Sequence, residues 1–121
     1  MDYDTKLADR LREYLAKIPN LEIEEKKMFS VLNFMVNGKT CVCASGENLM
    51  CRFDPKLQEE IAEKNGYETM LMKNKEYKGY CYINPVGFKE NKDFEYFVNL
   101  CLEYNKVSKA SNKSKQKTMN R

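Results

Sequence analysis

Two turn signals within one short stretch decide the fold that the sequence predicts. Residues 28–53 read MFSVLNFMVNGKTCVCASGENLMCRF. Asn37-Gly38 is the dipeptide that best supplies the two positive φ angles of a type I′ hairpin turn, and Gly46-Glu47 fits a two-residue turn with glycine at the first central position. The segments around both turns are rich in branched and aromatic side chains. The stretch therefore predicts a three-strand antiparallel meander over residues 28–36, 39–45 and 48–53.

Helical patterns flank this meander. Apolar residues recur at three- and four-residue spacing over residues 3–18, and Pro19 ends the pattern. After the meander, Asp54-Pro55 predicts an N-cap followed by proline in the first turn of a short helix that ends before Gly66. A third helix, with its own apolar stripe, is expected over residues 92–105.

Two further strands are expected between the second and third helices. They are YETMLM at residues 67–72 and GYCYIN at residues 79–84, joined across KNKEYK. The elements together predict an α+β fold, in which an antiparallel meander sheet of about five strands carries three helices packed on it. Residues 1–105 are long enough to form one domain with its own core.

The last sixteen residues differ from the rest in charge and pattern. They contain no acidic residue and six basic ones: Lys106, Lys109, Lys113, Lys115, Lys117 and Arg121. Removing these six from the 21 basic residues leaves 15 against 18 acidic residues, a net charge of −3 for residues 1–105. Residues 106–121 are therefore expected to be a disordered basic tail. This tail would either solubilise an acidic domain or make salt-sensitive contacts to nucleic acid.

The composition excludes several classes of function. The chain has no histidine, which removes the commonest general base and every Ser-His or Cys-His nucleophile pair. Phosphate-binding glycine loops and nucleophile elbows are absent from the sequence. We therefore expect no enzyme activity, no catalytic residue and no cofactor. The N-terminal residues are charged throughout and no window is long and apolar enough to span a membrane, so we expect a cytoplasmic protein without membrane contact.

Three of the five cysteines lie within residues 41–51. With the Gly46-Glu47 turn, alternation along the strands predicts Cys41 and Cys43 on one face of the sheet and Cys51 on the other. Zinc sites normally take four Cys or His ligands from paired knuckles, which this chain lacks, so no metal is expected. Structural reduced thiols are the favoured interpretation, and a redox-active Cys41 or Cys43 is the alternative.

Both faces of the predicted meander look apolar. Leu32 and Phe34 are expected beside Cys41 and Cys43, and further apolar residues, including Cys51, are expected on the opposite face. A sheet that is buried on both sides needs two layers of cover. The three helices could supply them, or a second subunit could cover the remainder, so homodimerisation is a hypothesis and Cys41 and Cys43 are candidate interface residues.

Several short motifs resemble one known family, the TfoX N-terminal domain. They are Lys27-Met28-Phe29, Phe34-Met35, Asn37-Gly38-Lys39, the hairpin through Leu49, and Lys78-Gly79-Tyr80 with Tyr82 and Pro85. The resemblance covers roughly residues 1–105, with the elements in the same order. This chain departs from the family pattern at Ser30-Val31, where members usually have two glycines. Longer members also carry a second, C-terminal domain, where this chain has the basic tail.

The resemblance implies a small α+β domain with a non-enzymatic role in transcriptional regulation or protein interaction, as in regulators of natural competence. We therefore expect a regulatory or adaptor domain that acts through contact with an unidentified protein partner. Two alternatives stay open. One is a nucleic-acid-binding protein that uses the basic tail, and the other is a thiol-based redox sensor.

Overall fold

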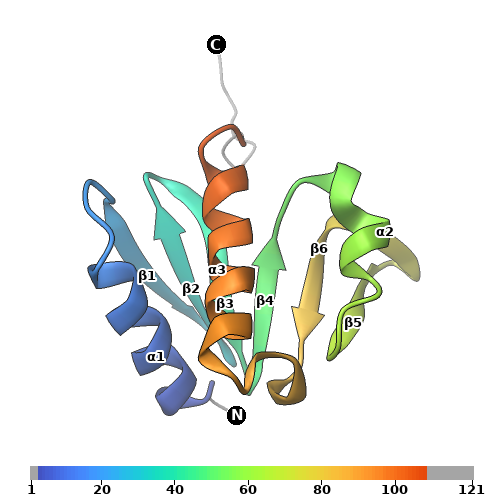
Figure 1. Cartoon of the computed structure of the whole chain (residues 1–121), viewed down its shortest axis with the longest axis horizontal. Coiled ribbons are helices and arrows are strands. Elements are labelled where there is room, and N and C mark those ends of the chain that lie inside the picture. The colour runs from blue at the N-terminus through green and yellow to red at the C-terminus, as the bar shows by residue number, and fades with distance from the viewer. Residues whose placement is uncertain (1–2, 109–121) are drawn as a thin grey trace.

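A computed structural model describes residues 3–108, and Figure 1 shows their arrangement. Within this range the elements are α1 (Thr5–Ala16), β1 (Ile23–Met28), β2 (Val31–Val36), β3 (Lys39–Ser45), β4 (Asn48–Arg52), α2 (Gln58–Ile61), β5 (Tyr67–Met72), β6 (Lys75–Ile83) and α3 (Asn91–Asn105), with short 3₁₀ turns at Pro55–Leu57 and Pro85–Phe88. The predicted α+β class is confirmed, with six strands in place of about five.

The six strands form one antiparallel sheet in the order β1-β2-β3-β4-β6-β5. Both predicted hairpin turns are confirmed. Asn37 and Gly38 have φ angles of 53° and 82°, and Gly46 has a φ of 56° at the first central position of its turn. The first four strands therefore follow one another as neighbours, because each turn is only two residues long.

The prediction of one strand over residues 28–36 is wrong. Met28 ends β1, Phe29 and Ser30 form a turn, and β2 begins at Val31. Two properties made this hairpin difficult to predict from the sequence. All six residues of β1 are exposed because it is an edge strand, so its charged sequence needs no apolar alternation. The turn, in addition, places phenylalanine at a φ of 49°, where glycine or asparagine is usual.

The segment predicted to be a loop over residues 73–78 also belongs to the sheet. Lys73 and Asn74 form a two-residue turn with φ angles of 53° and 68°, and β6 begins at Lys75. The positive φ angles of both central residues are those of a type I′ turn. Lysine is not a typical residue for that position, so the hairpin gave little signal in the sequence.

The core lies between one face of the sheet and the helices. Figure 1 shows α1 and α3 on the same side of the sheet. The two helices contact each other where the Tyr14 hydroxyl donates to Asn99 Oδ1 at 2.8 Å. Leu11 of α1, Ile61 of α2 and Val98 of α3 are fully buried in one cluster with the facing strand residues. Burial of such a side chain stabilises the fold by roughly 1.5–3 kcal/mol.

Candidate functional site

The pairing of β3 with β4 has the predicted register. Cys43 lies opposite Met50, and Val42 lies opposite Cys51. Opposed residues of an antiparallel pair project from the same face of the sheet. Cys43 and Cys51 therefore lie on opposite faces, as the two-residue turn predicted.

A β-bulge changes the face that was predicted for Cys41. Met35 pairs with Thr40, but Phe34 pairs with Val42, so Cys41 is an extra residue between them. A bulge interrupts the alternation of side chains along its strand. Cys41 and Val42 consequently both belong to the cluster beneath the helices.

The prediction that Cys41 and Cys43 share a face is therefore wrong. Cys41 is buried in the core with Cys51, whereas Cys43 lies on the face that carries no helix. The same bulge places Leu32 and Phe34 in the core beneath the helices and not beside Cys43. Leu32 and Phe34 therefore do not contribute to the apolar character that was predicted for the face of Cys43.

All five cysteines are buried as free thiols. Burial raises the pKa of Cys41 far above its ordinary value and raises the pKa of Cys43 to about 12. Hydrogen bonding to the thiols of Cys101 and Cys81, followed by burial, raises the pKa of Cys51. The thiolate is the reactive form of cysteine, so these shifts disfavour the reactive form of Cys41, Cys43 and Cys51 near neutral pH.

The sheet face opposite the helices carries one row of residues that crosses all six strands. From β1 to β5 the row runs Lys26, Asn33, Cys43, Met50, Tyr82 and Glu68. Cys43 Sγ donates to Asn33 Oδ1 at 3.4 Å, and Asn33 Nδ2 donates to Thr40 Oγ1 at 3.1 Å. These two contacts satisfy the hydrogen-bonding groups of the Asn33 side chain, which is buried because Asn33 is only 6% exposed. The row thus has a basic residue at one end, small and polar residues beside it, and an acidic residue at the other end.

The β5–β6 hairpin extends beyond the part of the sheet where β6 pairs with β4. That pairing covers residues 80–83, whereas β6 begins at Lys75. We call residues 70–79 the ribbon. Leu71 is 59% exposed, Met72 55% and Tyr77 40%. The ribbon therefore concentrates apolar surface that no other described element covers.

Buried Gln58 of α2 fixes the base of the ribbon. Its Oε1 accepts from the Gly79 backbone N–H at 2.8 Å, and its Nε2 donates to the Tyr67 hydroxyl at 2.7 Å. The rings of Tyr77 and Tyr80 stack with centroids 4.5 Å apart. The base of the ribbon is thus held in place, and the turn at its far end carries lysine.

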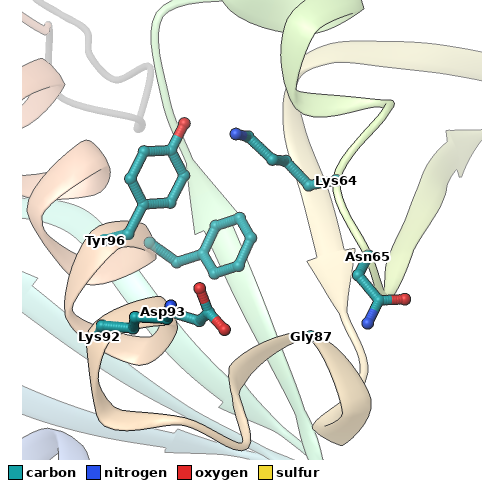
Figure 2. A pocket seen from close by; sticks show the side chains of 7 residues that line it. Lys64, Asn65, Gly87, Lys92, Asp93 and Tyr96 are labelled. Carbon is teal, nitrogen blue, oxygen red and sulfur yellow. The ribbon is translucent and has the colours of Figure 1, made fainter.

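A cavity of about 300 Å³ lies between the loop after α2 and the first turn of α3. Figure 2 shows Lys64, Asn65, Gly87, Lys92, Asp93 and Tyr96 around it. Lys64 Nζ lies 4.9 Å from the centre of the Tyr96 ring. Both lysines are exposed and Asp93 is half-exposed. The cavity therefore lacks the buried polar group that would hold a small ligand in one orientation.

Lys39 joins the start of β3 to the end of α3. Its Nζ donates to the backbone oxygen of Asn105 at 2.5 Å and to that of Ser108 at 2.9 Å. The Asn105 side chain in turn donates to the Val36 carbonyl at 3.1 Å. Lys39 belongs to the Asn37-Gly38-Lys39 motif, but the sequence alone did not assign it this capping role.

The predicted basic tail lies mostly outside the described residues. Lys106 is the C-cap of α3, and its Nζ is 3.0 Å from Glu103 Oε2. The other five predicted contacts, Lys109, Lys113, Lys115, Lys117 and Arg121, fall outside residues 3–108. Within that range, we find no set of three His, Cys, Asp or Glu side chains placed to bind a metal ion. No helix in the described part of the chain has the length and apolar character needed to span a membrane.

Comparison with known proteins identifies the family. Neither the curated proteins nor the solved structures that were compared with the chain gave a match. Residues 13–104 match the TfoX N-terminal domain. The match extends from α1 to the last turn of α3, and it includes the hairpin motif that contains Lys39. The chain therefore belongs to the TfoX N-terminal domain family, and its α+β domain is a competence-regulator-like domain.

Proposed function

We propose that this protein is a non-catalytic regulatory domain that acts in the cytoplasm by binding a protein partner. Membership of the TfoX N-terminal domain family supports a regulatory role. The observation that carries the mode of action is the set of exposed apolar side chains on the ribbon, with Met72 and Tyr77 on one face and Leu71 on the other. Apolar surface gathered on one protruding element is typical of a protein contact site.

The chemistry of the ribbon favours a protein partner over nucleic acid. Leu71 and Met72 are aliphatic, and such side chains gain more from burial in a protein interface than from contact with phosphates. Methionine also adapts its shape to different partners. The ribbon has no arginine, which is the commonest residue in specific base contacts.

Nucleic-acid binding is the second candidate function, and the lysines of the ribbon favour it. Lys73, Lys75 and Lys78 lie close together, with Glu76 as the one acidic residue among positions 70–79. Together with the basic residues beyond position 108, they would provide a sequence-independent attraction to phosphate. A thiol-based sensor is the least favoured alternative, because all five thiols are buried.

Affinity capture from the native host, with quantitative mass spectrometry, tests the proposal. The bait is the full chain, compared with a Leu71→Asp/Met72→Asp variant. Val86→Asp serves as the matched control, since Val86 is 64% exposed but lies outside the ribbon. We expect a defined protein to be captured by the wild type and the control and to be lost from the ribbon variant. Equal capture by all three baits would contradict the role of the ribbon.

Fluorescence anisotropy with duplex and single-stranded DNA separates the second candidate. A Lys73→Gln/Lys75→Gln/Lys78→Gln variant and a chain that ends at residue 108 are compared with the full chain at low salt. Tight binding that both changes weaken, together with no captured protein, would replace the proposed function with nucleic-acid binding.

A further inference from the structure

The sheet face opposite the helices is not covered by any helix of residues 3–108. Figure 1 shows α1 and α3 on the other side. Val31, Met35, Met50 and Tyr82 lie on the uncovered face and are only half-buried. A flat antiparallel sheet face of this kind either faces water or packs on a second sheet at about 10 Å.

We propose that two copies of this chain pack through this face, about a two-fold axis that runs parallel to the strands. Such an axis places β1 of one copy over β5 of the other, β2 over β6, and β3 over β4, because it reverses the strand order β1-β2-β3-β4-β6-β5. A two-fold interface requires a surface that is complementary to itself under this operation.

The exposed and half-buried residues of the row, Lys26, Met50, Tyr82 and Glu68, have this self-complementarity. Met50, which is half-buried, lies over the position of Cys43 in the second copy, and the Cys43 side chain is already buried within its own chain. Tyr82, which is also half-buried, lies over the position of Asn33, whose amide is already hydrogen-bonded within its own chain. At the rim, Lys26 meets Glu68, which is an opposite-charge pair, and the two-fold axis creates each of these contacts twice. The three pairings follow from the strand register alone.

A two-fold axis that runs along the row is disfavoured by charge. An axis parallel to the row would place each residue opposite the same residue of the second copy, so Lys26 would face Lys26 and Glu68 would face Glu68. Like charges opposite one another are destabilising. The charges at the two ends of the row thus favour the axis parallel to the strands over the axis along the row.

The size of the face predicts a weak dimer. Five gaps between six strands, at about 4.8 Å each, make the face roughly 24 Å wide, and three side-chain rows make it roughly 15–20 Å long. Two such faces would bury roughly 700–1,000 Å² in total, which is below the standard size of stable interfaces and typical of weak or transient ones. Rim charges change the affinity of such an interface measurably.

Analytical ultracentrifugation of the full chain, from about 10 to about 500 μM at low salt, tests the dimer. Lys26→Glu alone and Glu68→Lys alone each turn two attractive pairs into two repulsive ones, and each should weaken dimerisation roughly tenfold or more. The double variant Lys26→Glu/Glu68→Lys restores the pairs and should restore dimerisation. Lys89→Glu is the control, with the same charge change at an exposed residue just before α3.

Glu68 Oε2 also accepts a hydrogen bond from Asn84 Nδ2 at 3.1 Å within one chain. Circular dichroism must therefore show that each variant is folded. The internal hydrogen bond is lost both in Glu68→Lys and in the double variant. If the double variant dimerises again, the weaker dimerisation of Glu68→Lys is due to the contact between copies and not to the internal bond. A wild-type chain that stays monomeric, or a dimer that the double variant fails to restore, overturns the proposal. The dimer goes beyond the proposed function and does not depend on it, because the ribbon lies outside the row.

Discussion

Replacement of Lys39 by methionine tests how the C-terminal helix is attached to the sheet. The ammonium group of Lys39 donates to the carbonyls of Asn105 and Ser108, at the end of a 15-residue helix. Methionine has a similar length and keeps the apolar stem, but it removes the charge and both donors. The substitution therefore isolates the capping interaction from side-chain packing.

The expected loss in the free energy of unfolding combines three contributions. A hydrogen bond from a charged donor contributes about 1.5–3 kcal/mol when water is excluded, but Lys39 is only half-buried and water can replace it at both carbonyls. A cation at a helix C-terminus contributes about 0.3–1 kcal/mol. Ordering of the lysine side chain opposes these by roughly 1.5–2 kcal/mol. We expect Lys39→Met to lower the free energy of unfolding by about 1.5 kcal/mol, and Lys39→Arg to lose less.

Urea unfolding of the full chain, followed by circular dichroism, measures this loss. In thermal unfolding, the same loss of about 1.5 kcal/mol would lower the Tm of a domain of this size by roughly 6 °C. Lys89→Met is the matched control because it removes one lysine outside the capping interaction. If Lys39→Met unfolds at the same urea concentration as the control, the two hydrogen bonds do not stabilise the end of α3 and the reasoning is refuted.

Three further outcomes are expected. Phe29 has a φ of 49° and a side chain that is 96% exposed, so Phe29→Asn should raise the free energy of unfolding by about 0.5–1 kcal/mol; a less stable variant would contradict backbone strain at this turn. A Cβ on Gly87 would contact the Asn65 backbone oxygen and lie 2.6 Å from Ile83 Cγ2, so Gly87→Ala should lower stability by about 2 kcal/mol in the same assay. Burial raises the pKa of the Cys43 thiol to about 12, so the unfolded thiol ionises first as the pH rises. Stability should be fully present below pH 8 and fall above about pH 9, by about 1.4 kcal/mol per pH unit for each such thiol; equal stability at pH 7.5 and pH 10.5 would refute this.

Turn chemistry explains which hairpins could be predicted from the sequence. Asn37-Gly38 and Gly46 are residues that adopt positive φ angles readily, and both turns were predicted correctly. Phe29 and Lys73 adopt the same angles, but they are not typical turn residues. The sequence therefore gave no turn signal for the β1–β2 hairpin and little for the β5–β6 hairpin, although Asn74 would have been compatible with a turn.

The candidate site was predicted less well than the fold. The turn fixed the register of Cys43 and Cys51 correctly, but a single extra residue at the bulge moved Cys41 to the other face. Bulges depend on how two strands fit together, and neither strand carries a local signal for one. The role of Lys39 was missed for a related reason, since its partners lie 66 and 69 residues away in the sequence.

The position of α3 has a consequence for synthesis of the protein in the cell. This helix packs on β3 and β4 in the centre of the sheet, and yet it is the last element of the described chain to leave the ribosome. Until residues 91–105 have emerged, the apolar face of the nascent sheet, including Leu49 and Cys51, is without its central cover. Translation that stops before α3 is complete would therefore release a sheet prone to aggregation, so rapid completion of this helix protects the nascent chain.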